Sequence, residues 1–158
     1  MRLDLITFRS FRNLLKVDLN LAPGFNILWG DNGHGKTNVL EGIYLLGHLK
    51  SFRPGRNEEL IRQGDPKCLI GARLKSGEVS RQIELTIEPH RKIPRLDGKS
   101  PNKAGDFFGF LRPILFAPEE VNLARGGPGG RRGLIDRAVF QTEPLFLDRS
   151  REYDRHLK

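Results

Sequence analysis

The sequence of 158 residues contains a single cysteine, and this scarcity excludes several kinds of site. Cys68 has no second cysteine to pair with, so no disulfide can form within the chain. No other residues with metal-ligand spacing surround it, and we interpret it as a small buried apolar side chain. Aromatic residues make up only 8% of the sequence, which argues against a ladder of rings stacked on nucleic-acid bases.

Long apolar runs are missing as well. No stretch approaches the roughly 20 apolar residues that a membrane-spanning helix requires. The N-terminus, MRLDLITFRSFRN, is interrupted by charges at Arg2, Asp4, Arg9 and Arg12, unlike a secretory signal peptide. We therefore expect a cytoplasmic protein that does not associate with membranes.

Basic residues, in contrast, are in excess. The 27 Lys and Arg residues against 19 Asp and Glu give a net charge of +8. Such an excess favours a polyanionic partner without naming it, and a solvated basic face is the alternative.

Alternating or continuous apolar residues predict the N-terminal elements. The stretches RLDLITF and LLKVDLN predict two strands joined by a turn, and FNILWG, residues 25–30, predicts a buried strand. Val39, Leu40, Ile43, Tyr44 and Leu46 fall at helical spacing, and Gly47 is the expected end of that helix.

The rest of the sequence predicts three more strands and then helices. The three strands lie between residues 67 and 101, with KSGE and LDGK as hairpin turns. After them we expect a short helix at residues 102–111, a buried strand at 113–118 and a helix start at 118–124. A glycine-rich loop at 126–130 and two helices at 131–158 are expected to follow.

The stretch GDNGHGKT satisfies the pattern G-x-x-x-x-G-K-[ST], with a predicted strand before it and a predicted helix after it. Glycines allow the backbone to curl around phosphate oxygens, while N–H groups of the turn and of the helix N-terminus point at the anion. The pattern predicts a nucleoside triphosphate site made of Gly30, Asp31, Asn32, Gly33, His34, Gly35, Lys36 and Thr37.

Two of these residues have a predicted chemical role. The ammonium of Lys36 is expected to meet the β- and γ-phosphates, and the hydroxyl of Thr37 is expected to bind a magnesium ion that bridges them. His34 stands at a variable position of the pattern, so we assign it no proton transfer. The alternative is a glycine-rich turn without a ligand.

Other parts of a triphosphatase are not evident. The guanine-reading pattern N-K-x-D is met only by NKAG, so guanine specificity is unsupported. Asp136 and Asp148 are the candidates for the acid that holds magnesium on a second strand, but both lie in stretches that predict surface helices. We expect no hydrolysis from this stretch alone.

Four segments together resemble the RecF family of bacterial recombination mediators, which are related to SMC and ABC-type ATPases. They are LITFRSFRN, FNILWGDNGHGKTNVLEGIYLL, SFRPGRNEELIRQG and FAPEEVNLARGGPGGRRGLIDRAV. The resemblance covers nearly the whole sequence and is strongest with the N-terminal part of family members. The later signature segment and the second-strand acids of the family's ATPase head are absent.

The resemblance implies an α/β P-loop ATPase head of the ABC/SMC type, with a mixed sheet that has an antiparallel part. It places an incomplete ATP-binding lobe at residues 1–117 and the start of a helical second lobe at 118–158. It also implies that Arg12 and Asn13 lie near the nucleotide; a surface role for both is the alternative.

The same resemblance implies a function in DNA repair. Family members bind ATP and Mg²⁺, dimerise with ATP, and bind single-stranded DNA and duplex ends or gap junctions. With RecO and RecR they support recombinase loading, replication restart and the SOS response. A weak DNA-dependent ATPase activity is implied for the complete protein.

Exposed basic residues are the candidates for contacts with DNA phosphates, namely Arg53, Arg56, Arg91, Lys92 and Arg95. Two other interpretations remain open. One is a small phosphoryl-transfer kinase, which would need a second substrate pocket and an arginine-bearing lid. The other is a basic binding module in which the phosphate loop is vestigial.

Overall fold

A computed structural model of the chain describes residues 2–101, 107 and 109–116, with isolated positions at 129, 132, 135, 139 and 153. The chain divides into two compact units, Met1–Pro113 and Ile114–Lys158. Nearly all described residues belong to the first unit, and the fold described below is that of this unit.

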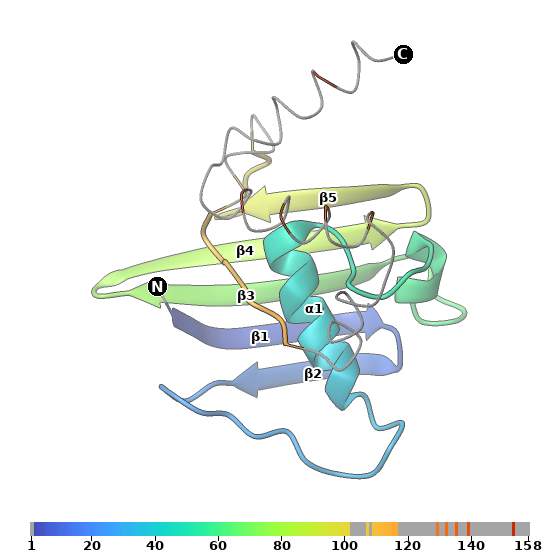
Figure 1. Cartoon of the computed structure of the whole chain (residues 1–158), viewed down its shortest axis with the longest axis horizontal. Helices are drawn as coiled ribbons and strands as arrows, with labels where there is room; N and C mark the ends of the chain where they lie inside the picture. Colours follow the sequence, from blue (N-terminus) through green and yellow to red (C-terminus); the bar gives the residue numbers. More distant parts are fainter. Residues whose placement is uncertain are drawn as a thin grey trace. The chain divides into compact units, whose positions relative to one another are not determined.

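The first unit is built on one sheet of five strands in the order β2-β1-β3-β4-β5 (Figure 1). Every neighbouring pair in this sheet is antiparallel. The strands are β1 (Arg2–Phe11), β2 (Leu14–Asn20), β3 (Cys68–Ser76), β4 (Val79–Glu88) and β5 (Arg91–Leu96). The two predicted N-terminal strands and the three later ones are therefore confirmed.

Turns lie at both places where the sequence predicted a hairpin, but only the first of them joins two strands of the sheet. Gly77 and Glu78 join β3 to β4, with Ser76 paired to Val79, and Gly77 has a φ of 58°. After β5, Asp97 and Gly98 both have positive φ, and Leu96 and Lys99 exchange backbone hydrogen bonds across them. An Asp-Gly pair favours this kind of turn because both residues tolerate a left-handed backbone.

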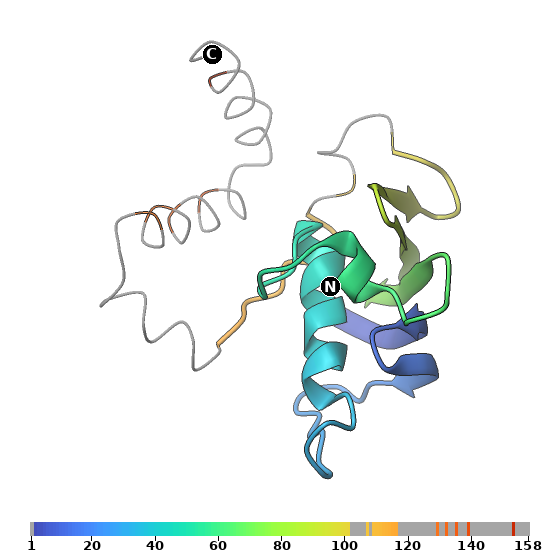
Figure 2. The same cartoon turned by 90° about the vertical axis from the view of Figure 1, so that its right-hand side faces the viewer.

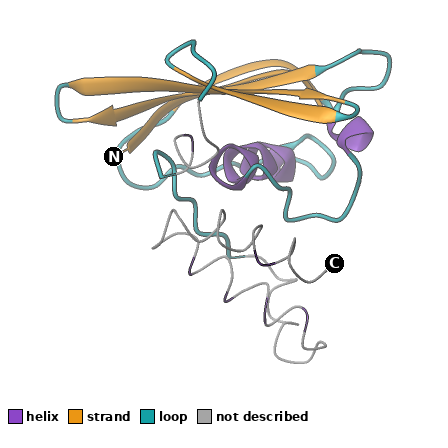
Figure 3. Ribbon diagram, turned by 90° about the horizontal axis from the view of Figure 1, so that it is seen from above, coloured by secondary structure: helices purple, strands orange, loops and turns teal. Residues whose placement is uncertain are grey.

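One helix covers one face of the sheet. The helix α1 (Lys36–His48) crosses the strands and forms a second layer, which is seen from the side in Figure 2 and from above in Figure 3. The chain then passes through a short 3₁₀ helix, η1 (Asn57–Leu60), before it enters β3. Leu49 ends α1 in a left-handed conformation, with its N–H bonded to the carbonyl of Leu45.

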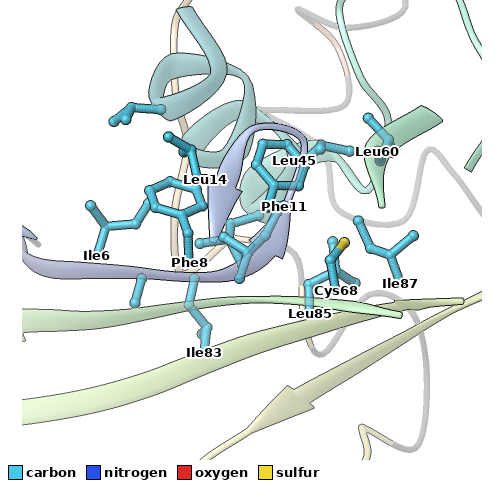
Figure 4. Close-up of a cluster of buried hydrophobic side chains, with 14 of the residues drawn as sticks. Ile6, Phe8, Phe11, Leu14, Leu45, Leu60, Cys68, Ile83, Leu85 and Ile87 are labelled. Carbon is cyan, nitrogen blue, oxygen red and sulfur yellow. The ribbon is translucent and has the colours of Figure 1, made fainter. Parts of the chain in front are cut away.

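The core lies between this helix and the sheet. Alternate residues of the strands face α1 and are buried, as are apolar residues of the helix and of η1 (Figure 4). Those labelled in the figure are Ile6, Phe8, Phe11, Leu14, Leu45, Leu60, Cys68, Ile83, Leu85 and Ile87.

The prediction of a buried strand at residues 25–30 is wrong. This segment has no strand geometry, and Phe25, Ile27 and Trp29 are 100%, 84% and 89% exposed. An apolar strand needs neighbours on both sides, and the five described strands already pair with one another in a single ladder. The segment instead continues beyond β2 as a loop that leads to α1 (Figure 1).

The predicted strand at 113–118 is wrong in its described part. Residues 113–116 have no strand geometry, and the side chains of Ile114 and Phe116 are 87% and 90% exposed. The sheet is antiparallel throughout its described strands, so the parallel strands expected of a mixed sheet are not part of it.

Most predictions beyond residue 101 fall outside the described residues. These are the helix start at 118–124, most of the loop at 126–130 and of the two helices at 131–158, and the candidate acids Asp136 and Asp148. Of the short helix predicted at 102–111, residue 107 is helical, whereas residues 109–111 are not. Residue 129, inside the predicted loop, is helical, as are residues 132, 135, 139 and 153 of the predicted helices. In the part of the chain that is described, no helix is both long and apolar enough to cross a bilayer.

Candidate functional site

The phosphate-loop pattern lies between the exposed loop and the N-terminus of α1. Gly30, Gly33 and Gly35 have φ values of 137°, 85° and 91°, which L-residues with a side chain rarely adopt. The first intrahelical bond that follows joins the N–H of Val39 to the carbonyl of Gly35, at 3.0 Å. The loop therefore has the curled backbone that the pattern predicts, and the preceding N–H groups of the helix start have no partner within it.

Gly35 fixes how closely this loop approaches the sheet. It is buried, and a Cβ built there would lie 2.6 Å from the Leu14 side chain and 2.9 Å from the Asn13 side-chain oxygen. A side chain at this position would push the start of α1 away from the turn between β1 and β2. The glycine is thus required by space as well as by its φ of 91°.

The Lys36 side chain folds back over the loop. Its Nζ donates to the carbonyl oxygens of Gly30 and Asp31, at 2.6 and 2.7 Å. An ammonium group has three N–H donors, so these two bonds leave one for a ligand. The lysine thus closes the loop on itself and places a positive charge where the loop opens to solvent.

The next residue, Thr37, exposes its side chain at the first turn of α1. Its hydroxyl is the type of oxygen ligand that Mg²⁺ accepts alongside nucleotide phosphates and water. Among the described residues no cluster of three or more His, Cys, Asp or Glu side chains can hold a metal ion by itself. A magnesium ion at this place would therefore have to arrive with the phosphates.

Asn13 ties the β1–β2 turn to the phosphate loop. Its Nδ2 donates to the carbonyl oxygen of Gly33 at 2.7 Å, and its Oδ1 accepts from Nδ2 of Asn38 at 2.8 Å. The Oδ1 of Asn38 in turn accepts from Nη1 of Arg53 at 2.9 Å. A chain of side-chain hydrogen bonds thus runs from the loop along α1 to the segment that follows the helix.

Arg12 is held by a buried carboxylate on α1. Its Nε and Nη2 donate to the two oxygens of Glu41 at 2.9 and 2.8 Å, and its Nη1 donates to the Glu59 carbonyl at 2.9 Å. Glu41 is 0% exposed and also accepts from Ser51 at 2.5 Å and from Arg53 at 3.3 Å. A buried carboxylate is tolerated when it is fully paired in this way.

Arg12 and Asn13, which were both expected near the nucleotide, differ in whether they contact the phosphate loop. Asn13 touches the phosphate loop directly, whereas the hydrogen bonds recorded for the Arg12 side chain go to Glu41 and Glu59.

Three of the five basic residues proposed for DNA contact gather in one cavity. Arg53, Arg56 and Lys92 line a cavity of about 250 Å³ that also includes Arg12 and Lys50. The other two lie elsewhere on β5. Arg91 pairs with Glu88 at 2.6 Å, and Arg95 is an exposed residue opposite Glu84.

Sequence reasoning missed Glu41, Asn38 and Lys50. Glu41 stands four residues before Leu45 on the buried side of α1, but no pattern along the sequence indicates a buried carboxylate there. Lys50 is the second residue after the end of α1 at His48, and a basic residue near a helix C-terminus is favourable. Leu40, which was placed on the apolar face, is 47% exposed instead.

Cys68 is buried, as the sequence predicted. Burial raises the pKa of its thiol to about 12, although the positive charge of Arg12 acts in the opposite direction. The thiol is therefore protonated at neutral pH and is not a nucleophile.

An antiparallel sheet, a glycine-rich loop and a helix that begins at a Lys-Thr pair together define the N-terminal portion of a P-loop ATPase head of the ABC/SMC type. Comparison with known proteins agrees with this class. The chain belongs to the RecF/RecN/SMC N-terminal domain family, whose model matches residues 1–93.

Within this family the similarity to RecF is high, which confirms the resemblance noted from the sequence. The whole chain is 45% identical to the DNA replication and repair protein RecF of Syntrophotalea carbinolica and 44% identical to that of Geotalea uraniireducens. It spans 44% and 43% of the length of these relatives, so it corresponds to less than half of each.

Solved structures give the same result for the fold. Structures of the recombination mediator protein RecF with ATP and with ATPrS, described as part of the RecFOR pathway, match 98% of the chain. Their TM-scores are 0.90 and 0.89 at 26% identity, and the match covers 43% and 42% of those chains. The SMC head domain from Thermotoga maritima shares the fold at 15% identity, with a TM-score of 0.51 over 65% of the chain.

Proposed function

We propose that this chain binds ATP with Mg²⁺ through residues 30–37 and is the N-terminal part of a RecF-type protein of DNA repair and recombination. The observation that carries the proposal is the curled loop closed by Lys36 at the open N-terminus of α1. Backbone N–H groups, the helix dipole and one ammonium group converge there, which suits a triphosphate. The ATP-containing RecF structures of the same fold support it.

Each residue of the loop has a role in this proposal. The backbone N–H groups from Gly30 to Gly35, including those of Asp31, Asn32 and His34, surround the phosphates, and Lys36 neutralises their charge. Thr37 binds the magnesium ion. Asn13 holds the loop in shape through its bond to Gly33. Arg12 is connected to the loop through Glu41, Arg53 and Asn38.

The wider function that we propose follows from the relatives, which are named DNA replication and repair proteins. The protein works in the cytoplasm on single-stranded DNA and on duplex ends or gap junctions. With RecO- and RecR-type partners it supports recombinase loading, replication restart and the SOS response. ATP brings two copies together, and weak DNA-dependent hydrolysis belongs to the complete assembly.

Substitution of Lys36 tests the nucleotide site. Lys36→Ala removes a charged donor to phosphate, which costs about 3 kcal/mol, or roughly a hundredfold in Kd. Trp29 reports the binding, because it is the single tryptophan, is 89% exposed and immediately precedes Gly30. We expect ATP with Mg²⁺ to change its fluorescence in the wild type and not in the variant at matched concentrations.

Lys75→Ala is the control, since Lys75 is an exposed lysine at the far end of β3, opposite Arg2. It should bind ATP like the wild type. Equal ATP affinity of Lys36→Ala and the wild type would contradict the site.

A further inference from the structure

The cavity of about 250 Å³ next to α1 has an unusual lining. Five basic side chains face it: Arg12, Lys50, Arg53, Arg56 and Lys92. They come from the β1–β2 turn, from the segment after α1 and from β5, so the fold assembles them from distant parts of the sequence. No Asp or Glu is among the described residues that line the cavity.

This cavity is separate from the phosphate loop. None of residues 30–37 lines it. Glu41, whose carboxylate binds two of the cavity's arginines, lies five residues after Lys36 on α1, or roughly 7.5 Å along the helix. An anion in the cavity would therefore be a second one, in addition to a nucleotide at the loop.

The nearby carboxylates leave most of this positive charge without compensation. Glu41 is shared between Arg12 and Arg53, which are 19% and 36% exposed and reach the cavity from its inner wall. Glu59 receives the backbone N–H of Arg56 at 3.2 Å and is not among the lining residues. Glu41 thus compensates two of the five cationic side chains, Arg12 and Arg53, and no salt bridge is found for Lys50, Arg56 or Lys92 among the described residues.

The lysines add to the imbalance. Nζ of Lys92 donates to the Leu49 carbonyl at the end of α1, at 2.9 Å, which fixes the ammonium at the cavity. Burial lowers the pKa of Lys92, and the positive charge of Lys50 lowers it further. Two ammonium groups are thus close enough to repel each other, and a bound anion would remove that repulsion.

We propose that this cavity is a second phosphate-binding site, which holds one backbone phosphate of a nucleic acid. The proposal rests on the proposed function for the nature of the ligand, because DNA is the polyanion on which a repair protein acts. Size agrees: 250 Å³ has room for roughly eight waters at about 30 Å³ each, so a phosphate and its ester oxygens fit. Exposed Lys50 and Arg56 at the rim leave the site open to a long chain.

Charge-removing substitutions at the rim test the proposal. We would purify the chain in its full encoded length as wild type, Lys50→Ala and Arg56→Gln, and titrate each against a fluorescent gapped DNA duplex at several salt concentrations. One phosphate contact is worth about four- to sixfold in affinity at 0.15 M salt, and its loss flattens the slope of log K against log[salt] by about 1. We expect this loss for each variant.

Two controls accompany the rim variants. Lys75→Ala removes the same charge at the opposite end of the sheet and should bind DNA like the wild type. Lys50→Arg keeps the charge and should restore most of the affinity. Thermal unfolding of every variant shows whether a loss of binding comes from loss of the fold.

An ATP titration of the same variants, measured by Trp29 fluorescence, distinguishes a DNA phosphate in the cavity from a phosphate of the nucleotide. Lost ATP affinity with unchanged DNA affinity would overturn the proposal and assign the cavity to the nucleotide. DNA affinities equal to those of the wild type and of Lys75→Ala would also overturn it, while leaving ATP binding at the loop intact. The proposed function is tested separately by Lys36→Ala, which should lose ATP binding, whereas Lys50→Ala and Arg56→Gln should bind ATP like the wild type.

Discussion

At the scale of single residues, Glu41 organises the surroundings of the phosphate loop. Its buried carboxylate joins Arg12, Ser51 and Arg53, which otherwise belong to separate segments. Removing one partner from a buried ion pair costs more than the pair contributes, because the other charges remain without compensation.

Glu41→Gln should therefore destabilise the fold by about 3 kcal/mol, the lower part of the usual range, since Arg12 and Arg53 keep some contact with water. Urea denaturation measures this as a lower midpoint at an unchanged slope. Glu58→Gln is the matched control, because Glu58 is exposed, and its effect should stay within about 0.5 kcal/mol. Equal midpoints for the two variants would refute the role of Glu41.

No pattern along the sequence predicted this role. Of the apolar positions predicted on α1, Val39, Tyr44 and Leu46 are buried and Leu40 is 47% exposed. Glu41 is buried beside them because its partners lie far away in sequence, an arginine 29 residues before it and another 12 residues after it. Local periodicity does not contain that information.

At the scale of elements, the contact between α1 and β1 depends on one glycine. A Cβ at Gly42 would overlap the ring of Phe8, a fully buried residue of β1. The helix therefore lies against the aromatic ring with no space for a methyl group.

Gly42→Ala should destabilise the protein by up to about 2 kcal/mol, because overpacking costs about 1–3 kcal/mol and alanine regains roughly 1 kcal/mol in a helix. Leu40→Ala, at a position 47% exposed on the same helix, should change stability much less. The double variant Gly42→Ala with Phe8→Leu should lose less than the sum of its single variants, as a double-mutant cycle would measure. Strict additivity would mean that the two side chains do not compete for space.

Elements with local signals were predictable. Period-two alternation and the Gly77–Glu78 turn predicted β3 and β4, and the Asp97–Gly98 turn predicted the end of β5. The glycine-lysine pattern predicted the start of α1. The stretches around Ile27 and Phe116 misled the prediction, because apolar composition indicates that a segment prefers burial without indicating which partner buries it.

At the scale of the whole molecule, not every apolar segment of the chain contributes to the stability of the fold. The described sheet and α1 contain the core, while the exposed apolar residues Phe25, Ile27 and Trp29 are not part of it. The chain spans less than half of the RecF relatives that it matches, and the solved RecF structures extend well beyond the shared region.

Two substitutions of similar chemistry should therefore differ widely. Ile70→Ala removes a side chain that is 0% exposed in the central strand β3 and should cost about 2–5 kcal/mol. Phe25→Ser changes a residue that is 100% exposed and should alter stability by at most about 0.5 kcal/mol. Calorimetric unfolding of both variants beside the wild type measures the contrast, and a large loss for Phe25→Ser would show that the segment packs against the core in solution.

The hydrogen-bonded path from Gly33 through Asn13 and Asn38 to Arg53 connects the phosphate loop with the basic cavity. Any coupling free energy between binding at the loop and binding in the cavity is reciprocal. Whatever factor a triphosphate at one end adds to the affinity for a polyanion at the other, the polyanion adds the same factor to the retention of the triphosphate. Where that factor exceeds one, the molecule releases its nucleotide least readily while it is engaged with its target.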